Sequence, residues 1–400
     1  MKKILITSLS DISKDSRVLK QVKTLLNNNY FVITAAFQNL NLNSTNHIHI
    51  QLTNKHKLKF IFLSLNRFYK LTEDLISILN LNTLKEIINP YILDMKNKLK
   101  SIDFDLIISN DLLTLPAIIH LSNNKKPIIL DLHEYFPEEY TDNKTWVLFY
   151  KNFYLHLLKK YQNKLNQINL ITVNESIAKL YRENFNINKF NIIRNIPYYH
   201  NLSPRVIEDN LIKLVHVGRA LKSRKLENMI LAFKYIKSNL NFLVDFYLVT
   251  NDKDSQNYLE YLKNLAQNEI NNPNIKINFL KPINQDDLIN KLNEYDIGLS
   301  YMYPSNINNL YCLPNKLFQY MQARLAILAS PNPEMAKIVN EYNLGLVSKN
   351  YEPQELAKSL QLFNKQNIML FKQNSDKASK LLNFENESKI LLNLINSLLN

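Results

Sequence analysis

Cysteine, glycine and long apolar runs are scarce in this chain of 400 residues, and each shortage excludes a class of protein. The single cysteine, Cys312, rules out an internal disulfide framework and a four-cysteine metal site, and no adjacent histidine supports it as a catalytic thiol. No stretch reaches the roughly 18 uninterrupted apolar residues of a membrane span. The N-terminal residues also lack the apolar core of a signal peptide. These absences predict a cytoplasmic protein.

Only three glycines are present, Gly218, Gly298 and Gly345, whereas asparagine, lysine, isoleucine and leucine are plentiful. An AT-rich coding sequence explains this bias more simply than a functional demand. Loops that would ordinarily use glycine must therefore use asparagine or serine. The apolar content of 46% is typical of a globular protein, and 400 residues suffice for two domains that each bury a core.

The formal net charge of +14 suits nucleic acid, an anionic membrane surface or phosphate-bearing ligands. Lysines are scattered along the whole chain without an Arg-rich arm or a nucleic-acid motif, so we expect no nucleic-acid partner. Two stretches, 56–81 and 145–165, interleave aromatic residues with lysines. Such stretches are typical both of core helices and of helices at a membrane surface. Peripheral contact with the inner face of an anionic cytoplasmic membrane therefore remains one of two interpretations.

Apolar strand-like runs alternate with helix-like stretches along most of the chain, which predicts an α/β fold with parallel sheets covered on both faces. The pattern breaks at 198–210 and then restarts. We therefore predict two doubly wound Rossmann-like domains, 1–200 and 201–380, facing a central cleft where ligands bind, and a C-terminal helix at 381–400. The expected strands are 2–9, 30–37, 105–111, 127–135, 168–176, 190–197, 212–220, 242–250, 275–280, 295–302, 325–330 and 344–348.

The segment 216–230, HVGRALKSRKLENMI, places cations where a predicted strand ends. Gly218 and Arg219 end the strand, and Arg224 and Lys225 follow just before a helix. Two cations at this spacing can converge on one diphosphate, although a solvated loop with ordinary charges is the alternative. A glycine kept at this position in so glycine-poor a chain indicates tight backbone geometry.

The segment LPNKLFQYM (313–321) opens a short helix with a Pro-Asn-Lys turn. The N–H groups and the positive dipole end of such a turn suit an anion, and the turn also brings Lys316. This segment closely resembles the nucleotide-sugar site of retaining GT-B glycosyltransferases, family 4 in particular. The loop at 216–230 is similar to the G-R loop of that family, which holds the donor phosphates. The resemblance implies donor contacts for Gly218, Arg219, Arg224, Lys225, Asn315, Lys316, Leu317, Gln319 and, in the P-E-M turn, Glu334.

The chain departs from the family pattern at several of these positions. The family has two glutamates separated by seven residues, and here Tyr311 and Gln319 stand in their places. Gln319 can still exchange hydrogen bonds with ribose hydroxyls, but a role that needs charge would be lost. Lys225 stands where the family often has glycine, and Arg324 replaces a small residue. Glu334 has two open interpretations, a donor-sugar contact or a helix cap.

Three segments of the first half resemble motifs of a bacterial surface-polysaccharide branch of family 4. DLHEYFPEEY (131–140) is similar to its D-x-H-E-x-F-P-E signature, and SNDLLTLP (109–116) to its H-D-L motif with Asn110 in place of histidine. SLSDISKDSRVLKQ (8–21) resembles its first loop. Structural packing is the alternative for Asp131 and His133. The resemblance implies acceptor or sugar contacts for Asp15, Arg17, Asp111, Asp131, His133 and Glu134.

The resemblance thus implies transfer of a sugar, with retention of configuration, from a nucleotide-sugar donor to a surface-glycan or lipid-linked acceptor. Domain 1–200 would bind the acceptor and domain 201–380 the donor, with His133, Arg219 and Arg224 as catalytic residues. No Asp-x-Asp cluster is present, so we expect neither a metal nor a cofactor, the nucleotide sugar being a substrate. Two alternatives remain: a nucleotide-sugar epimerase on the same fold, and a non-catalytic glycosyltransferase-like subunit.

Overall fold

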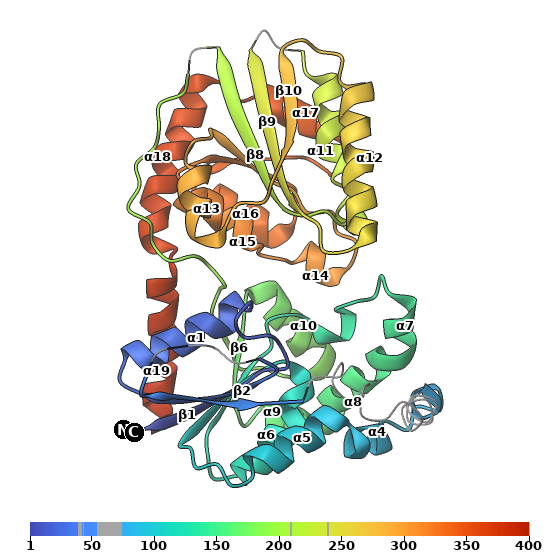
Figure 1. Ribbon diagram of the computed structural model, residues 1–400, viewed down its shortest axis with the longest axis vertical. Helices are drawn as coiled ribbons and strands as arrows, with labels where there is room; N and C mark the ends of the chain where they lie inside the picture. The colour runs from blue at the N-terminus through green and yellow to red at the C-terminus, as the bar shows by residue number, and fades with distance from the viewer. Residues whose placement is uncertain (39–41, 43, 54–73, 209, 238–239, 400) are drawn as a thin grey trace. The chain divides into compact units, whose positions relative to one another are not determined.

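The computed structural model describes residues 1–38, 42, 44–53, 74–208, 210–237 and 240–399. The chain forms two compact units (Figure 1). The first comprises Met1–Asn195 with Ser388–Asn400, and the second comprises Ile196–Glu387. Each unit has one sheet of parallel strands, and the predicted α/β class with two parallel sheets is confirmed.

The sheet of the first unit has the order β3-β2-β1-β4-β5-β6-β7, and all its pairs are parallel. The strand order reverses between β1 and β4, and the carboxyl end of a sheet at such a point is where doubly wound folds bind ligands. The strands are β1 (Lys3–Thr7), β2 (Phe31–Ala36), β3 (His47–Gln51), β4 (Leu106–Asn110), β5 (Ile128–Asp131), β6 (Asn169–Thr172) and β7 (Phe190–Ile192).

One face of this sheet is covered by helices from the two ends of the chain, α1 (Ser16–Asn27) and α19 (Phe384–Leu399) (Figure 1). Val22 of α1 and Ile395 of α19 pack with Ile4 of β1 in one buried cluster. Further helices among the described residues of the unit include α4 (Asn82–Ile88), α5 (Pro90–Leu99), η1 (Leu112–Thr114), α6 (Leu115–Ser122), η2 (Phe136–Glu138), α7 (Lys144–Trp146), η3 (Val147–Lys151), α8 (Asn152–Lys160), α9 (Gln162–Leu165) and α10 (Glu175–Phe185).

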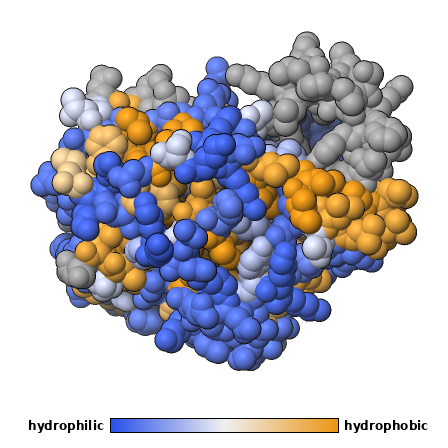
Figure 2. Space-filling view, turned by 90° about the horizontal axis from the view of Figure 1, so that it is seen from below, coloured by the Kyte–Doolittle hydropathy of each residue, from blue (hydrophilic) through white to orange (hydrophobic). Residues whose placement is uncertain are grey.

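The two lysine- and aromatic-rich stretches of the first unit differ in burial. Residues 56–73 of the first stretch lie outside the described residues. In the second, Phe153 and Leu157 of α8 are fully buried, which favours the core interpretation there. Around α4, by contrast, large apolar side chains are exposed, and Figure 2 shows apolar surface gathered on the side where Figure 1 draws α4. Among the described residues, no helix has both the length and the apolar character needed to cross a membrane.

The sheet of the second unit has the order β10-β9-β8-β11-β12-β13, again with parallel pairs only. Its strand order reverses between β8 and β11, so β8 ends at a second switch point. The strands are β8 (Leu211–Arg219), β9 (Asn241–Val249), β10 (Ile275–Leu280), β11 (Ile297–Ser300), β12 (Ala326–Ala329) and β13 (Gly345–Val347).

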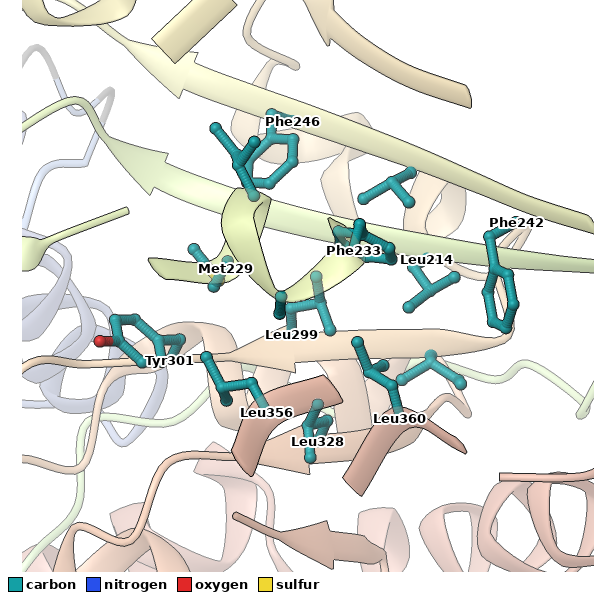
Figure 3. Close-up of a cluster of buried hydrophobic side chains, with 14 of the residues drawn as sticks. Leu214, Met229, Phe233, Phe242, Phe246, Leu299, Tyr301, Leu328, Leu356 and Leu360 are labelled. Carbon is teal, nitrogen blue, oxygen red and sulfur yellow. The ribbon is translucent and has the colours of Figure 1, made fainter. Parts of the chain in front are cut away.

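Alternate residues of β8 enter two different cores, as the period of two along a strand requires. Leu214 belongs to the cluster under α11 (Glu227–Ala232) and α17 (Pro353–Gln361), which Figure 3 shows. Val215 belongs to the cluster on the opposite face. The other helices are η4 (Lys222–Arg224), η5 (Phe233–Tyr235), α12 (Lys253–Glu269), α13 (Gln285–Leu292), α14 (Ile307–Leu310), α15 (Asn315–Gln322), α16 (Pro333–Glu341) and α18 (Lys365–Leu381).

Asparagine takes the place of glycine in the left-handed turns, as the composition predicts. Seven of the ten described non-glycine residues with positive φ are asparagines, and none of the three glycines has a positive φ. Gly298 instead allows close packing, because a Cβ there would lie 2.3 Å from Cγ of Tyr320. The chain therefore keeps this glycine where a side chain would not fit.

The predicted strand at 127–135 is too long, because β5 ends at Asp131. The following backbone is held by a side chain. The Tyr181 hydroxyl donates to the carbonyl of Glu134 at 2.7 Å and accepts the N–H of Phe136 at 3.1 Å. Residues 132–135 therefore form a fixed loop at the carboxyl edge of the sheet.

Candidate functional site

The loop after β8 carries the predicted cations on a tight backbone. β8 ends at Arg219, the turn begins at Ala220, and η4 begins at Lys222. Lys225 then adopts the left-handed conformation, with φ 45° and ψ 52°. Glycine reaches this conformation at the lowest cost, which gives a physical reason for the glycine that the resembling family often has here. In this chain, Lys225 Nζ lies 3.9 Å from the ring centroid of Tyr303, and this cation–π contact offsets part of the cost of the left-handed backbone.

Gly218 leaves room for Arg224. A Cβ at residue 218 would lie 3.3 Å from Nη1 of Arg224. Burial and the nearby Arg219 lower the pKa of Arg224. Within the described part of the chain, neither Arg219 nor Arg224 forms an ion pair or a side-chain hydrogen bond. The charge of Asp252 acts on Arg219 without forming an ion pair with it. Two guanidinium groups outside any ion pair, one of them partly buried, form a site that suits an anion.

The turn that opens α15 adds a third cation. Pro314 is the N-cap and supplies no side-chain cap bond, Asn315 is exposed, and Lys316 is 6% exposed. Lys316 Nζ donates to the carbonyl of Tyr301 at 2.6 Å. Burial lowers the pKa of Lys316 well below its ordinary value, and the charge of Arg224 adds to this effect. An arriving anion would stabilise the ammonium form of Lys316 and so raise this pKa again.

His216 belongs to this cluster, although sequence reasoning missed it. It is fully buried on β8, and its Nδ1 lies 2.9 Å from the carbonyl oxygen of Leu299. Its Nε2 has no hydrogen-bond partner. Burial lowers the pKa of His216 well below its ordinary value, with further contributions from Lys316 and Arg224. The only signal in the sequence was a histidine flanked by the apolar residues Val215 and Val217, two residues before a glycine.

The remaining predicted donor residues occupy different environments. Leu317 is fully buried and its N–H donates to the carbonyl of Pro314, so we expect it to shape the turn. Gln319 is partly exposed on α15. Glu334 is 7% exposed in the first turn of α16, where the helix dipole stabilises negative charge. The donor contacts of Gln319 and Glu334 stay predictions.

Arg17 and Asp131 of the first unit pair with each other. Arg17 Nε and Nη2 donate to the two carboxylate oxygens of Asp131 at 2.5 and 2.9 Å, and Nη1 donates to the carbonyl of Ile193 at 2.9 Å. Both side chains are buried. Asp15 accepts the N–H groups of Arg17 and Val18 and so caps α1. These contacts give the three residues structural roles, and their predicted substrate contacts stay predictions.

Asp111, His133 and Glu134 lie at the carboxyl edge of the first sheet. His133 Nε2 is 3.9 Å from Asp111 Oδ1, and Nδ1 is 3.9 Å from Asp131 Oδ1. Burial opposes protonation of His133, yet the carboxylates around it, Asp131 first, raise its pKa above the ordinary value. Burial also raises the pKa of Asp111 and of Glu134. The group can therefore hold a proton near neutral pH.

Glu139 is a further acid in this region that sequence reasoning did not single out. Burial, followed by repulsion from Glu134, raises its pKa to about 8. The motif match ended at Glu138, whose carboxylate pairs with Lys151 at 2.6 Å. Across the described residues, no group of three histidine, cysteine or acidic side chains is arranged to hold a metal. Metal independence itself stays a prediction.

A family comparison decides which proteins the second unit resembles. Residues 202–380 match the family Glycosyl transferases group 1. This match includes the loop after β8, the α15 turn and the first turn of α16, so it spans every predicted donor residue. A comparison with curated protein sequences gave no match.

Solved glycosyltransferase structures share the fold of the whole chain. Sucrose-phosphate synthase from Thermosynechococcus elongatus has a TM-score of 0.69 at 12% identity, covering 100% of this chain and 99% of that one. Anabaena HepE, solved with UDP and glucose, has a TM-score of 0.62 at 13% identity, covering 99% and 100%. WaaG, a glycosyltransferase of lipopolysaccharide biosynthesis, has a TM-score of 0.63 at 11% identity, covering 98% and 99%. The fold is therefore the GT-B glycosyltransferase fold, as predicted.

Proposed function

We propose that this protein is a retaining, metal-independent glycosyltransferase that moves a sugar from a nucleotide-sugar donor to a surface-glycan or lipid-linked acceptor. The observation that carries the proposal is the convergence of Arg219, Arg224 and Lys316 at the end of β8, within the segment that matches group 1. Among the described residues, neither guanidinium forms an ion pair with an acid. A diphosphate supplies the negative charge that this cluster lacks.

The cations would act on the leaving group. As the bond from the sugar to the diphosphate breaks, negative charge grows on the phosphate oxygen, and Arg219 and Arg224 stabilise it. In a retaining transfer, the leaving diphosphate then helps to deprotonate the acceptor hydroxyl on the same face of the sugar. The protein supplies position and charge and needs no nucleophile of its own. Three cations can neutralise a diphosphate without a divalent metal.

His133 is the proposed catalytic residue of the first unit. The carboxylates around it favour its protonated form, which can donate a hydrogen bond to a sugar hydroxyl or stabilise negative charge. Asp111 and Glu134, with raised pKa values, are the proposed sugar contacts beside it. An epimerase would need acid and base groups around the donor sugar, where Tyr311 and Gln319 stand instead. That difference favours the transferase.

Turnover across a panel of nucleotide sugars tests the proposal. We expect one donor to be hydrolysed slowly without an acceptor, in the presence of EDTA, and the first sugar released to keep the anomeric configuration of the donor. Inversion of configuration would contradict retention, and loss of turnover in EDTA would contradict metal independence. Interconversion of free nucleotide sugars would establish the epimerase. Donor binding without turnover, whichever acceptor is added, would support the alternative of a non-catalytic subunit.

The region around α4 is the proposed membrane contact, which would place the protein at the inner face of the cytoplasmic membrane. Seven large apolar side chains between residues 75 and 93 are at least 42% exposed. The first unit holds 27 of the 49 basic and 16 of the 35 acidic residues, a formal charge of +11. Exposed apolar groups on a basic unit suit an anionic lipid surface. The seven side chains are Leu75, Ile78, Leu79, Leu81, Leu84, Ile87 and Leu93.

Co-sedimentation with vesicles tests this contact. Burying one such side chain contributes about 1.5–3 kcal/mol, so replacing Leu79 and Ile87 together by glutamate should weaken binding to phosphatidylglycerol vesicles by at least about tenfold. The matched control replaces Leu362 and Leu381 by glutamate. These two residues are similarly exposed in the second unit, and the control should bind like the wild type. Equal losses in both variants would contradict the contact. A dimer that only the first variant dissociates would assign the surface to a second copy of the chain.

A further inference from the structure

The tautomer of His216 is fixed by its surroundings. Nδ1 lies 2.9 Å from the carbonyl oxygen of Leu299, and a carbonyl oxygen only accepts, so Nδ1 must carry a proton and donate it. In the neutral imidazole, Nε2 then has a lone pair and no hydrogen. This nitrogen is fully buried and has no partner. A buried acceptor without a partner requires an explanation, because such groups are nearly always satisfied.

The unpartnered nitrogen borders the space over Gly218. The Cβ that Gly218 lacks would lie 3.5 Å from Nε2 of His216 and 3.3 Å from Nη1 of Arg224. The imidazole and the guanidinium therefore both lie against Gly218, on the side where another residue would carry its side chain. The other charged group that acts on His216 is Lys316 of α15. Phe246 of β9 packs against the ring with 5.8 Å between centroids and carries no charge.

A diphosphate in this space would change the protonation that His216 prefers. Phosphate oxygens only accept hydrogen bonds at neutral pH, so a bare Nε2 lone pair facing them is repulsive. A proton on Nε2 converts this repulsion into a charge-assisted hydrogen bond. The diphosphate also offsets the two cations that disfavour an imidazolium in the free protein. Both effects act in the same direction.

We propose that His216 is a positioning residue of the anion site, neutral in the free protein, which takes up one proton from solvent at Nε2 when a nucleoside diphosphate group occupies the space over Gly218. The inference rests on the proposed function, because it needs a diphosphate at this loop. No bond of the ligand changes in this step. Its consequence is that the donor binds more tightly as pH falls, by at most about tenfold per pH unit for one proton.

Imidazole NMR of the full chain, labelled in its eight histidines, tests the proposal with UDP, GDP and ADP as probes. The His216 resonance is the one missing from His216→Gln. If that variant does not fold, the resonance is assigned in the wild type through its contact with Phe246. We expect no titration of this resonance between pH 5.5 and 8.5 in the free protein. With saturating nucleotide, it should titrate within that range.

Affinity provides the second readout. The ratio of the dissociation constants of His216→Gln and wild type should rise as pH falls, since the titration of the ligand itself cancels in the ratio. His120→Gln, an exposed histidine of α6 in the first unit, should match the wild type at every pH. A bound nucleotide with an unchanged, neutral His216 would overturn this inference alone. Failure of all three nucleotides to bind would overturn the proposed function and the inference with it.

Discussion

The two units differ in whether their motif arginine is paired with an acid. Arg17 of the first unit lies buried against Asp131, whose carboxylate balances its charge and accepts two hydrogen bonds from it. Arg224 of the second unit lies beside Arg219 and Lys316, and no acid pairs with it in the described part of the chain. A buried ion pair fixes structure, whereas a group of unpaired cations needs an anion from outside. Both arginines matched family motifs, so a motif match alone does not distinguish these two roles.

Removing the charge of Arg17 should have the largest effect on stability. Arg17→Met removes the bidentate partner of the buried Asp131 and leaves only Gln21 and His133 beside its carboxylate, and this should lower the free energy of unfolding by about 3–5 kcal/mol. Urea unfolding followed by the fluorescence of Trp146, the only tryptophan and part of the first unit, measures the loss. Lys3→Met, which removes an exposed pair with Asp103, should leave the free energy of unfolding nearly unchanged. Equal losses in the two variants would contradict a structural role for Arg17.

Removing the charge of Arg224 should act on the donor and leave stability unchanged. Arg224→Ala should reduce donor turnover by about 100-fold, since it removes one charge from the site of the leaving diphosphate. Lys222→Ala is the matched control, because Lys222 is exposed in the same short η4 helix. Its turnover should stay within about twofold of the wild type. Comparable losses in both variants would indicate a general effect of loop charge.

Packing behind the donor loop can be tested at Gly298. Gly298→Ala would press a methyl group against Tyr320, whose hydroxyl accepts the N–H of Val217 on β8 at 3.0 Å. Overpacking of this kind should lower the free energy of unfolding by about 1–3 kcal/mol, measured by circular dichroism in urea. In the double variant with Tyr320→Leu, the loss should be smaller than the sum of the single losses. Full additivity would mean that the two side chains do not conflict.

The pKa of Glu139 predicts a smaller effect that depends on pH. Its folded-state pKa of about 8 lies above the ordinary value, so its contribution to stability is lost as pH rises from about 4.5 towards 8. Glu139→Gln should therefore reduce the fall in unfolding free energy between pH 5 and pH 8 by about 1 kcal/mol, after allowance for partial exposure. Trp146 fluorescence in urea measures the difference. Glu138→Gln, at the neighbouring acid, is the matched control.

The alternation of strand-like and helix-like segments predicted the fold. The cations of the 216–230 loop predicted the anion site. Strand ends were harder to place, since the end of β5 depends on Tyr181, which is 50 residues away from Asp131. Such a contact exists only after folding. The strand β3 and the helices α4 and α5 were not predicted, because 47–51 is short and polar and the surface at 82–93 keeps apolar residues exposed.

The cations of the candidate site could be predicted from the sequence, whereas its histidine could not. Arg219, Arg224 and Lys316 stood in motifs whose spacing implied an anion. His216 stood in none, and its significance depends on the carbonyl of Leu299, 83 residues away. A motif also does not show whether one of its residues is buried. The motif therefore implied a donor contact for Leu317, which is fully buried. Pairing between distant residues likewise gave Arg17 and Asp131 structural contacts that no local pattern could indicate.

Hydrogen–deuterium exchange with and without bound nucleotide sugar tests the central claim most directly, because it locates the ligand in one unit. Ligand contacts slow the exchange of the backbone amides they cover. We predict that the strongest protection appears in segments 216–226 and 312–322 of the second unit, and that Arg224→Ala abolishes it. Protection centred on segments 109–116 and 131–140 of the first unit, with none at 216–226, would contradict the account.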